Sequence, residues 1–116
     1  MKPELEKRTK LFALQIIHFV ASLRSNRICE VMSRQLLKSG TSVGANYREA
    51  GRAESHDDFI HKIAICEKEA AETQYWLELF LEGKLASEEK CERLRQEASE
   101  LLAIFVASGR TAKGSR

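Results

Sequence analysis

The sequence predicts an all-α protein, folded as an up-and-down antiparallel four-helix bundle. Four segments carry apolar residues at alternating steps of four and three positions, which is the spacing of one face of an α-helix. Short connections join these segments, as they do in antiparallel bundles. The single proline, Pro3, lies ahead of every periodic segment, and no alternating stretch of convincing length predicts a strand.

The size and composition of the chain suit one such domain over residues 1–116, with no metal, cofactor or disulfide needed to hold it. Charged residues make up 31% and hydrophobic residues 43%, which is typical of a helical soluble protein. Cys29, Cys66 and Cys91 are odd in number, widely spaced and without a C-x-x-C pair. They indicate reduced thiols in the cytoplasm rather than a disulfide framework or a zinc site.

The first helix is expected at about residues 4–24. Part of it, residues 11–23, has the length of a signal-peptide core, but polar residues interrupt the run and its apolar spacing is amphipathic. A membrane span needs about 20 apolar residues, and the sequence contains no such stretch. We therefore expect a cytoplasmic protein that does not enter a membrane.

The second helix is expected at about residues 28–53, although its helix propensity is poor across residues 39–44. Each glycine there costs roughly 0.8–1.0 kcal/mol relative to alanine. Either one long helix is rescued by packing, or a Gly-Thr-Ser turn joins two helices. At about 100° per residue, the residues before and after this stretch stay on the same face of one helix. This favours the continuous helix, because a turn would have no reason to preserve their angular positions. This face holds Leu36, Gly40, Gly44, Tyr47 and Gly51.

The third helix is expected at residues 56–82 and the fourth at residues 88–107. Ser55 and Asp58 form a capping-box-like start for the third, and Gly83 with Lys84 is a plausible stop. Gly109 is expected to end the fourth helix, which leaves residues 108–116 as a frayed basic tail.

Charge is divided unevenly along the chain. Residues 1–54 carry ten Lys and Arg against five Asp and Glu, whereas residues 55–107 carry six against twelve. Such a division predicts pairing between the two halves, or between neighbouring subunits, through complementary faces. It could also leave one surface basic enough to hold phosphates.

The candidate functional residues all lie on the second helix. Arg34, Lys38, Arg48 and Arg52 form a basic stripe that could bind RNA or DNA backbone, or could simply be solvated or paired with the acidic third helix. The small residues on the other side predict close packing against a neighbouring helix, and Asn46 could set bundle register or a subunit contact. The packing and assembly candidates are Gly40, Gly44, Asn46, Tyr47 and Gly51.

Enzymatic alternatives lack the residues they need. A phosphate-binding loop requires a Gly-Lys-Ser/Thr ending that the glycine segment does not have. A di-iron site in a helical bundle needs Glu-x-x-His on two helices with two further carboxylates, and the chain offers one Asp58-x-x-His61. We therefore expect no catalytic activity and no metal site.

Three runs of the sequence resemble a known family. QLLKSGTSVGANYREAGRAES (35–55), FIHKIAICEKEAAETQYWLEL (59–79) and RTKLFALQII (8–17) are similar to the four-helix-bundle proteins encoded within intervening sequences of bacterial 23S rRNA genes. The resemblance implies an up-and-down bundle that assembles as a homopentamer, and it implies no catalytic residues. One branch of the family is the accessory protein of diversity-generating retroelements, which binds nucleic acid and is strongly basic. With a pI of about 8.5 this chain is more similar to an ordinary member.

Together these observations predict a non-enzymatic scaffold that assembles as a ring-shaped homo-oligomer and binds rRNA, other RNA or DNA through its basic stripe. The alternative is a protein–protein interaction module with no nucleic-acid role, in which subunit or partner contacts use the charge asymmetry.

Overall fold

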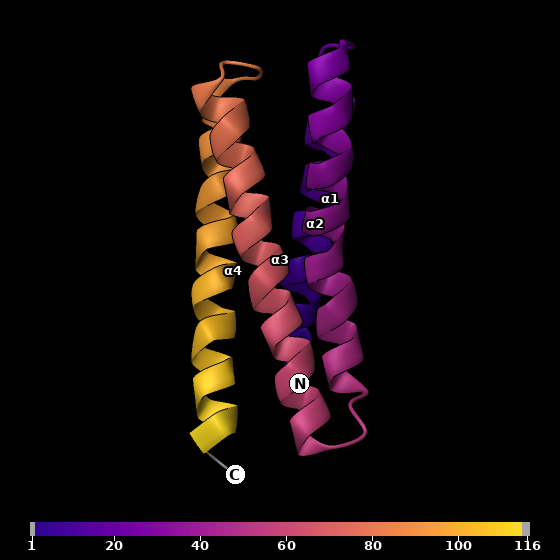
Figure 1. The fold of residues 1–116 in the computed structure, drawn as a ribbon, viewed down its shortest axis with the longest axis vertical. Coiled ribbons are helices and arrows are strands. Elements are labelled where there is room, and N and C mark those ends of the chain that lie inside the picture. The colour runs from indigo at the N-terminus through magenta and orange to yellow at the C-terminus, as the bar shows by residue number, and fades with distance from the viewer. Residues whose placement is uncertain (1, 115–116) are drawn as a thin grey trace.

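The structure, a computed structural model, describes residues 2–114 and confirms the predicted all-α four-helix bundle (Figure 1). The helices run up and down along a rod of 47 × 22 × 20 Å. None of the helices within residues 2–114 combines the length and apolar character that crossing a bilayer requires. The elements are α1 (Pro3–Ala21), α2 (Arg27–Gly51), α3 (His56–Glu82) and α4 (Glu88–Gly114).

Each helix packs against its neighbours in sequence, and the bundle closes where α1 meets α4. α2 lies between α1 and α3, and α4 packs broadly along α3. The seam between α1 and α4 is narrow by comparison, and the diagonal pairs meet only through long side chains in the core, such as Phe19 with Phe80 and Tyr47 with Phe105. Figure 1 shows α1 beside α2 and α3 beside α4. The first and second halves of the sequence therefore form two opposite sides of the bundle.

Polar caps fix where three helices begin. The Asn26 side chain accepts a hydrogen bond from the backbone N–H of Cys29 at 2.9 Å, and Ser55 accepts one from Asp58 at 3.0 Å. These bonds satisfy donors that the first helical turn leaves without a partner. Ser87 caps α4 in the same way through the N–H of Lys90, at 3.3 Å. The cap predicted at Ser55 is confirmed.

The end of α3 is a Schellman motif in which a lysine takes the left-handed position. The N–H of Leu85 donates to the carbonyl of Phe80, and that of Lys84 donates to Leu81, at 3.0 and 3.1 Å. Lys84 has φ 55°, a conformation that glycine adopts more readily. Gly83 keeps a helical φ of −77°. The predicted stop lies at the right place, but the lysine and not the glycine makes the turn.

α2 is one continuous helix, as the preserved phase of its small residues predicts. Gly40 is buried against α1, where an added Cβ would lie 3.0 Å from Ile16 Cγ1. At Gly44 the added atom would lie 3.3 Å from the backbone carbonyl of Thr9. Hydroxyls of Thr41 and Ser42 bond to carbonyls one turn earlier in the same helix. Tertiary packing therefore offsets the poor helix propensity of this segment.

The predicted end of the fourth helix at residue 107 is wrong, because α4 continues to Gly114. Gly109 has no positive φ, and the modest cost of one glycine does not stop a helix that is held beyond it. Ala112 is buried, and its carbonyl lies 2.7 Å from Nε2 of His56 at the start of α3. Part of the expected basic tail is thus helical and docked, while residues 115 and 116 lie outside the described part of the chain.

The core is apolar apart from a few hydroxyls, of which those of Thr9, Ser39 and Thr73 are hydrogen-bonded. Phe19 and Phe80 meet edge to face with ring centroids 5.6 Å apart. The Thr73 hydroxyl on α3 bonds to that of Ser39 on α2 at 2.9 Å, which satisfies a buried polar pair across the two helices. All three cysteines are free and buried, and burial raises the pKa of the Cys66 thiol to about 12.

Replacing glycine with alanine should destabilise the fold in α2 and stabilise it in α4. Gly40→Ala and Gly44→Ala should each lower the free energy of unfolding by about 1 kcal/mol, because overpacking at these contacts exceeds the gain in helix propensity. Gly109→Ala should raise it by up to about 1 kcal/mol, since its added Cβ would meet only Ile63 at 3.8 Å. Urea denaturation measures all three, and stabilisation by every variant would contradict the close approach of α1 and α2.

Candidate nucleic-acid interface

Four cations follow one outward strip of α2, and we call Arg34, Lys38, Arg48 and Arg52 the basic ridge. All four are exposed. From Arg34 to Arg52 the ridge covers 18 residue steps, or about 27 Å at 1.5 Å per residue. The strip faces outward because the opposite side of α2 is buried, with Leu36 and Val43 fully inaccessible to solvent. The four cations therefore lie where an extended anion can reach them together.

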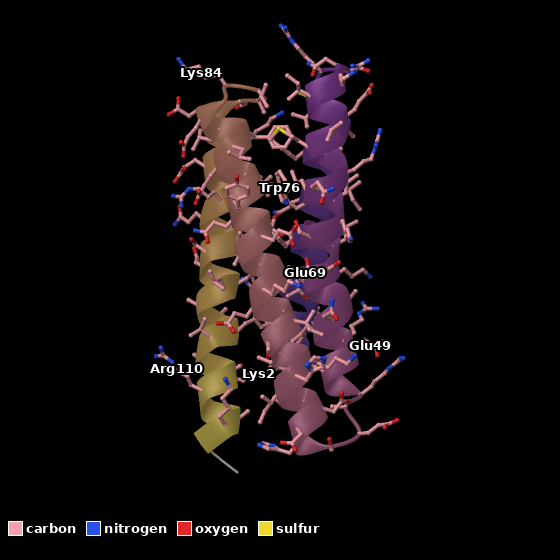
Figure 2. All side chains as sticks on the ribbon, in the orientation of Figure 1. Lys2, Glu49, Glu69, Trp76, Lys84 and Arg110 are labelled. Carbon is pink, nitrogen blue, oxygen red and sulfur yellow. The ribbon has the colours of Figure 1, made fainter. Side chains whose placement is uncertain are left out.

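The ridge is only partly neutralised by carboxylates. Nε of Arg48 lies 3.4 Å from a carboxylate oxygen of Glu6 on α1, and both side chains are partly exposed. Partial burial and the neighbouring Glu72 raise the pKa of the Glu69 carboxyl on α3. Lys38 lies close enough to Glu69 to oppose this rise. Figure 2 shows Glu69 on α3 at mid-height. Within residues 2–114, Arg34 and Arg52 form no ion pair.

The basic ridge lies on the basic side of the bundle. α1 and α2 come from the part of the sequence with twice as many cations as carboxylates, and α3 with most of α4 from the part with twice as many carboxylates. Because the two helix pairs form opposite sides (Figure 1), the charge division along the sequence becomes a charge division across the molecule. An approaching polyanion is attracted to the α1–α2 side.

A shallow groove runs beside the ridge between α1 and α2, with a volume of about 300 Å³. The groove is open because Gly44 has no side chain, and Ala13 and Ala45 contribute only methyl groups. Lys10 and Arg48 line it together with the carboxylate of Glu6. Thr9, Ala13 and Thr41 complete its lining.

The residues predicted to serve packing and assembly differ in their surroundings: some face α1 or the core, and others do not. Gly40 and Gly44 face α1, and Tyr47 is buried with its hydroxyl accepting a hydrogen bond from the backbone N–H of Lys2 at 3.0 Å. Asn46 donates to the carbonyl of Ser42 within α2 at 2.9 Å, so its amide does not bridge helices. Gly51 is exposed at the last position of α2.

Arg8, a cation from the basic first half of the chain, is tied down at the α1–α4 seam with its side chain partly exposed. Arg8 on α1 donates two hydrogen bonds to Glu97 and one to Glu100, both on α4, at 2.6–2.9 Å. These carboxylates raise the pKa of Arg8, the hydrogen bond to Glu97 most of all. Spacing within α1 gave no sign of this pairing, because the partners are about 90 residues away. Lys7 and Lys10 stay exposed.

The remaining sequence feature is the Asp58-x-x-His61 pair at the start of α3. Asp58 accepts a hydrogen bond from the backbone N–H of Glu54 at 3.2 Å. In the part of the chain that the structure describes, no three His, Cys, Asp or Glu side chains gather as metal ligands would.

Arg8→Ala should lower the free energy of unfolding by about 1 kcal/mol, at the upper end of exposed ion pairs, because one guanidinium holds two carboxylates across the narrow seam. The matched control is Arg93→Ala, which removes an exposed pair with Glu89 inside one helix and should cost about 0.3 kcal/mol. Urea denaturation at low and high salt measures both. Equal effects of the two substitutions would mean that the Arg8 cluster does not hold α1 to α4.

Comparison with known proteins gives a family model and a solved structure. The model described as "23S rRNA-intervening sequence protein" matches residues 2–107. The crystal structure of a protein of unknown function from the S23 ribosomal protein family of Bacteroides thetaiotaomicron is 36% identical, with a TM-score of 0.82. The match covers 90% of this chain and 96% of that one. No curated protein matches the chain.

Proposed function

Because the chain belongs to the family of 23S rRNA-intervening sequence proteins, we propose that it is a non-enzymatic scaffold that assembles into a ring and binds RNA or DNA through the basic ridge. The observation that carries the proposal is the ridge itself, an exposed row of cations about 27 Å long on the basic side of the bundle. Recognition of a nucleic-acid backbone needs cations spread over such a length.

The ridge supports recognition by charge and shape rather than by base sequence. Between Lys38 and Arg48 the outward strip of α2 carries Thr41, Ser42 and Ala45, and the hydroxyls of Thr41 and Ser42 donate their protons to carbonyls of their own helix. Within residues 2–114 no aromatic side chain belongs to the ridge or to the adjoining groove. Base stacking needs exposed aromatic rings, so the phosphates are the groups that the ridge is equipped to bind.

Ring assembly is supported by apolar side chains exposed on different faces. Leu11, Leu14 and Ile17 are 55%, 43% and 42% exposed on the outward face of α1. Val31 on α2 and Tyr75 on α3 are 51% and 53% exposed. α1 and α3 occupy diagonal corners of the bundle. A ring requires two different patches that meet head to tail, and the resemblance to homopentameric family members gives the expected number of subunits.

Replacing the four ridge cations by alanine should abolish most of the affinity for nucleic acid. Each lost phosphate contact should reduce the dependence of log affinity on log salt by roughly 0.7 for a single strand or 0.9 for a duplex. Fluorescence anisotropy with a labelled RNA fragment at two salt concentrations measures both quantities. Retained affinity in the variant, or no binding by the unaltered protein, would overturn the proposed interface.

The matched control removes the same number of positive charges from the acidic side of the bundle. Lys62, Lys68, Arg93 and Arg95 lie on α3 and α4. Their replacement by alanine changes net charge equally, so it should weaken binding far less than loss of the ridge. Equal loss in both variants would show that net charge and not the ridge drives binding.

Exchanging Leu11, Leu14 and Ile17 for glutamine should convert the ring to monomers, because their exposed surface would no longer gain from burial. Sedimentation velocity gives the mass, and circular dichroism checks that the helices persist. A single Ala103→Gln exchange at an exposed position of α4 is the control. A monomeric unaltered protein would refute assembly, whereas a salt-sensitive oligomer without nucleic-acid affinity would favour the protein-interaction alternative.

A further inference from the structure

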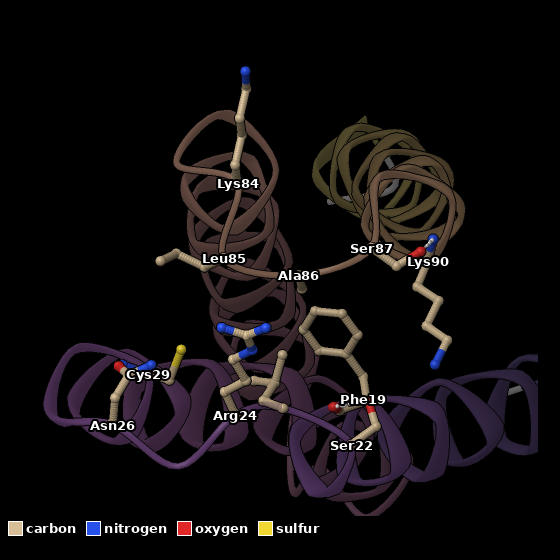
Figure 3. A pocket seen from close by; sticks show the side chains of 11 residues that line it. Phe19, Ser22, Arg24, Asn26, Cys29, Lys84, Leu85, Ala86, Ser87 and Lys90 are labelled. Carbon is tan, nitrogen blue, oxygen red and sulfur yellow. Dashed lines mark hydrogen bonds between the residues drawn. The ribbon is translucent and has the colours of Figure 1, made fainter.

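A second cationic site lies at the end of the bundle where the α1–α2 and α3–α4 connections meet (Figure 3). It is a pocket of about 500 Å³, within the range of small-molecule sites. Its apolar lining residues are Phe19, Leu23, Leu85 and Ala86, and Figure 3 shows Leu85 pointing away from the Phe19 ring. Its polar lining residues are Ser22, Arg24, Asn26, Lys84, Ser87 and Lys90.

Two of its cations approach from different elements. Arg24 extends from the α1–α2 connection and Lys90 from the first turn of α4, and in the view of Figure 3 the Phe19 ring lies between them. Lys84 points away from the other labelled side chains. Within residues 2–114 neither Arg24 nor Lys90 forms an ion pair, and no carboxylate lines the pocket. These two charges are therefore available to a ligand.

The neutral polar groups of the pocket also favour an anion. Oδ1 of Asn26 accepts the capping bond from Cys29, which leaves its NH₂ group to donate. The Ser87 oxygen accepts the capping bond from Lys90, which leaves the hydroxyl proton to donate. The Ser22 hydroxyl already donates its proton to the backbone carbonyl of Phe19, at 2.7 Å, so it is not a free donor. The pocket lining therefore combines two unpaired cations, two free hydrogen-bond donors and the Phe19 ring.

A smaller cavity of about 210 Å³ between α1 and α4 shares three lining residues with this pocket. The shared residues are Phe19, Ser22 and Lys90. Gln15 and His18 line its far part, together with Arg93, whose guanidinium is paired with Glu89. The two spaces adjoin at Lys90, so a ligand larger than a single anion has room to extend along the α1–α4 seam.

We propose that this pocket binds the phosphate monoester of a phosphorylated ligand, with Arg24 and Lys90 contacting the phosphate and Phe19 and Leu23 covering the apolar part. A guanidinium and an ammonium on opposite sides suit a dianionic group better than a singly charged phosphodiester. The same chemistry is presented by a free nucleoside monophosphate and by the terminal phosphate of a nucleic-acid strand. None of the four ridge cations lines this pocket, although Arg24 also lines a neighbouring hollow together with Arg34.

Binding is tested with adenosine 5′-monophosphate, with adenosine as the matched ligand that lacks the phosphate. Isothermal titration calorimetry should give saturable binding of the nucleotide, and the nucleotide should raise the melting temperature because it binds only the folded chain. Replacing Arg24 and Lys90 with glutamine should weaken the affinity at least tenfold. The control exchanges Arg110 and Lys113 for glutamine at the opposite end of the bundle, where Figure 2 shows Arg110 far from Lys84.

A paired measurement with 5′-phosphorylated and 5′-hydroxyl oligonucleotides distinguishes the two sources of the phosphate. Stronger binding of the phosphorylated strand, lost in the Arg24 and Lys90 variant, assigns the site to nucleic-acid ends. Binding of the mononucleotide alone assigns it to free nucleotides. The proposal is overturned if adenosine binds as well as its monophosphate, if no phosphate ligand binds, or if the variant keeps its affinity. The ridge variant should retain nucleotide binding, which separates this result from that of the proposed function.

Discussion

The close approach of α1 to α2 is the constraint on which the rest of the molecule depends. At Gly44 the backbone of α2 comes so near to Thr9 that even a methyl group would be crowded, and at Gly40 Ile16 fills the space that a side chain would take. Buried side chains of α1 and α3 can then reach α2 from its two flanks. The glycines that lower the intrinsic stability of α2 are therefore the residues that let it take a central place in the bundle.

This constraint also decides what α2 presents outward. Once Leu36, Val43 and Tyr47 face the core, helical geometry places the ridge cations on the solvent side, and the small residues open a groove beside them. Assembly and nucleic-acid binding can then use different surfaces, since the apolar face of α1 lies next to the ridge and not on it. Arg8 is withdrawn from that surface because it ties α1 to α4 at the narrow seam.

The two proposed anion sites differ in how they are built. The ridge consists of charges one to a few turns apart on a single helix, so its geometry is local and it suits an extended polymer. The end pocket is lined by Arg24 and Lys90, which come from a connection and a helix turn 66 residues apart in the sequence and lie on opposite sides of the Phe19 ring. A concave site with a partly apolar lining selects for the size and charge of one group, whereas a ridge selects for length and charge density.

The sequence alone was sufficient for the fold class, the four helices, the cap at Ser55 and the continuity of α2, because helical periodicity and capping depend on residues within a few positions of each other. It also placed the ridge cations on one strip of one helix.

Tertiary structure decided the rest. α4 passes Gly109 because Ala112 is buried and contacts His56, Lys84 rather than Gly83 makes the left-handed turn, and Gly51 is exposed at a helix end. The pairing of Arg8 with Glu97, and the pocket that Arg24 and Lys90 both line, involve distant parts of the chain. No local pattern encodes such contacts, since they exist only when the helices are packed.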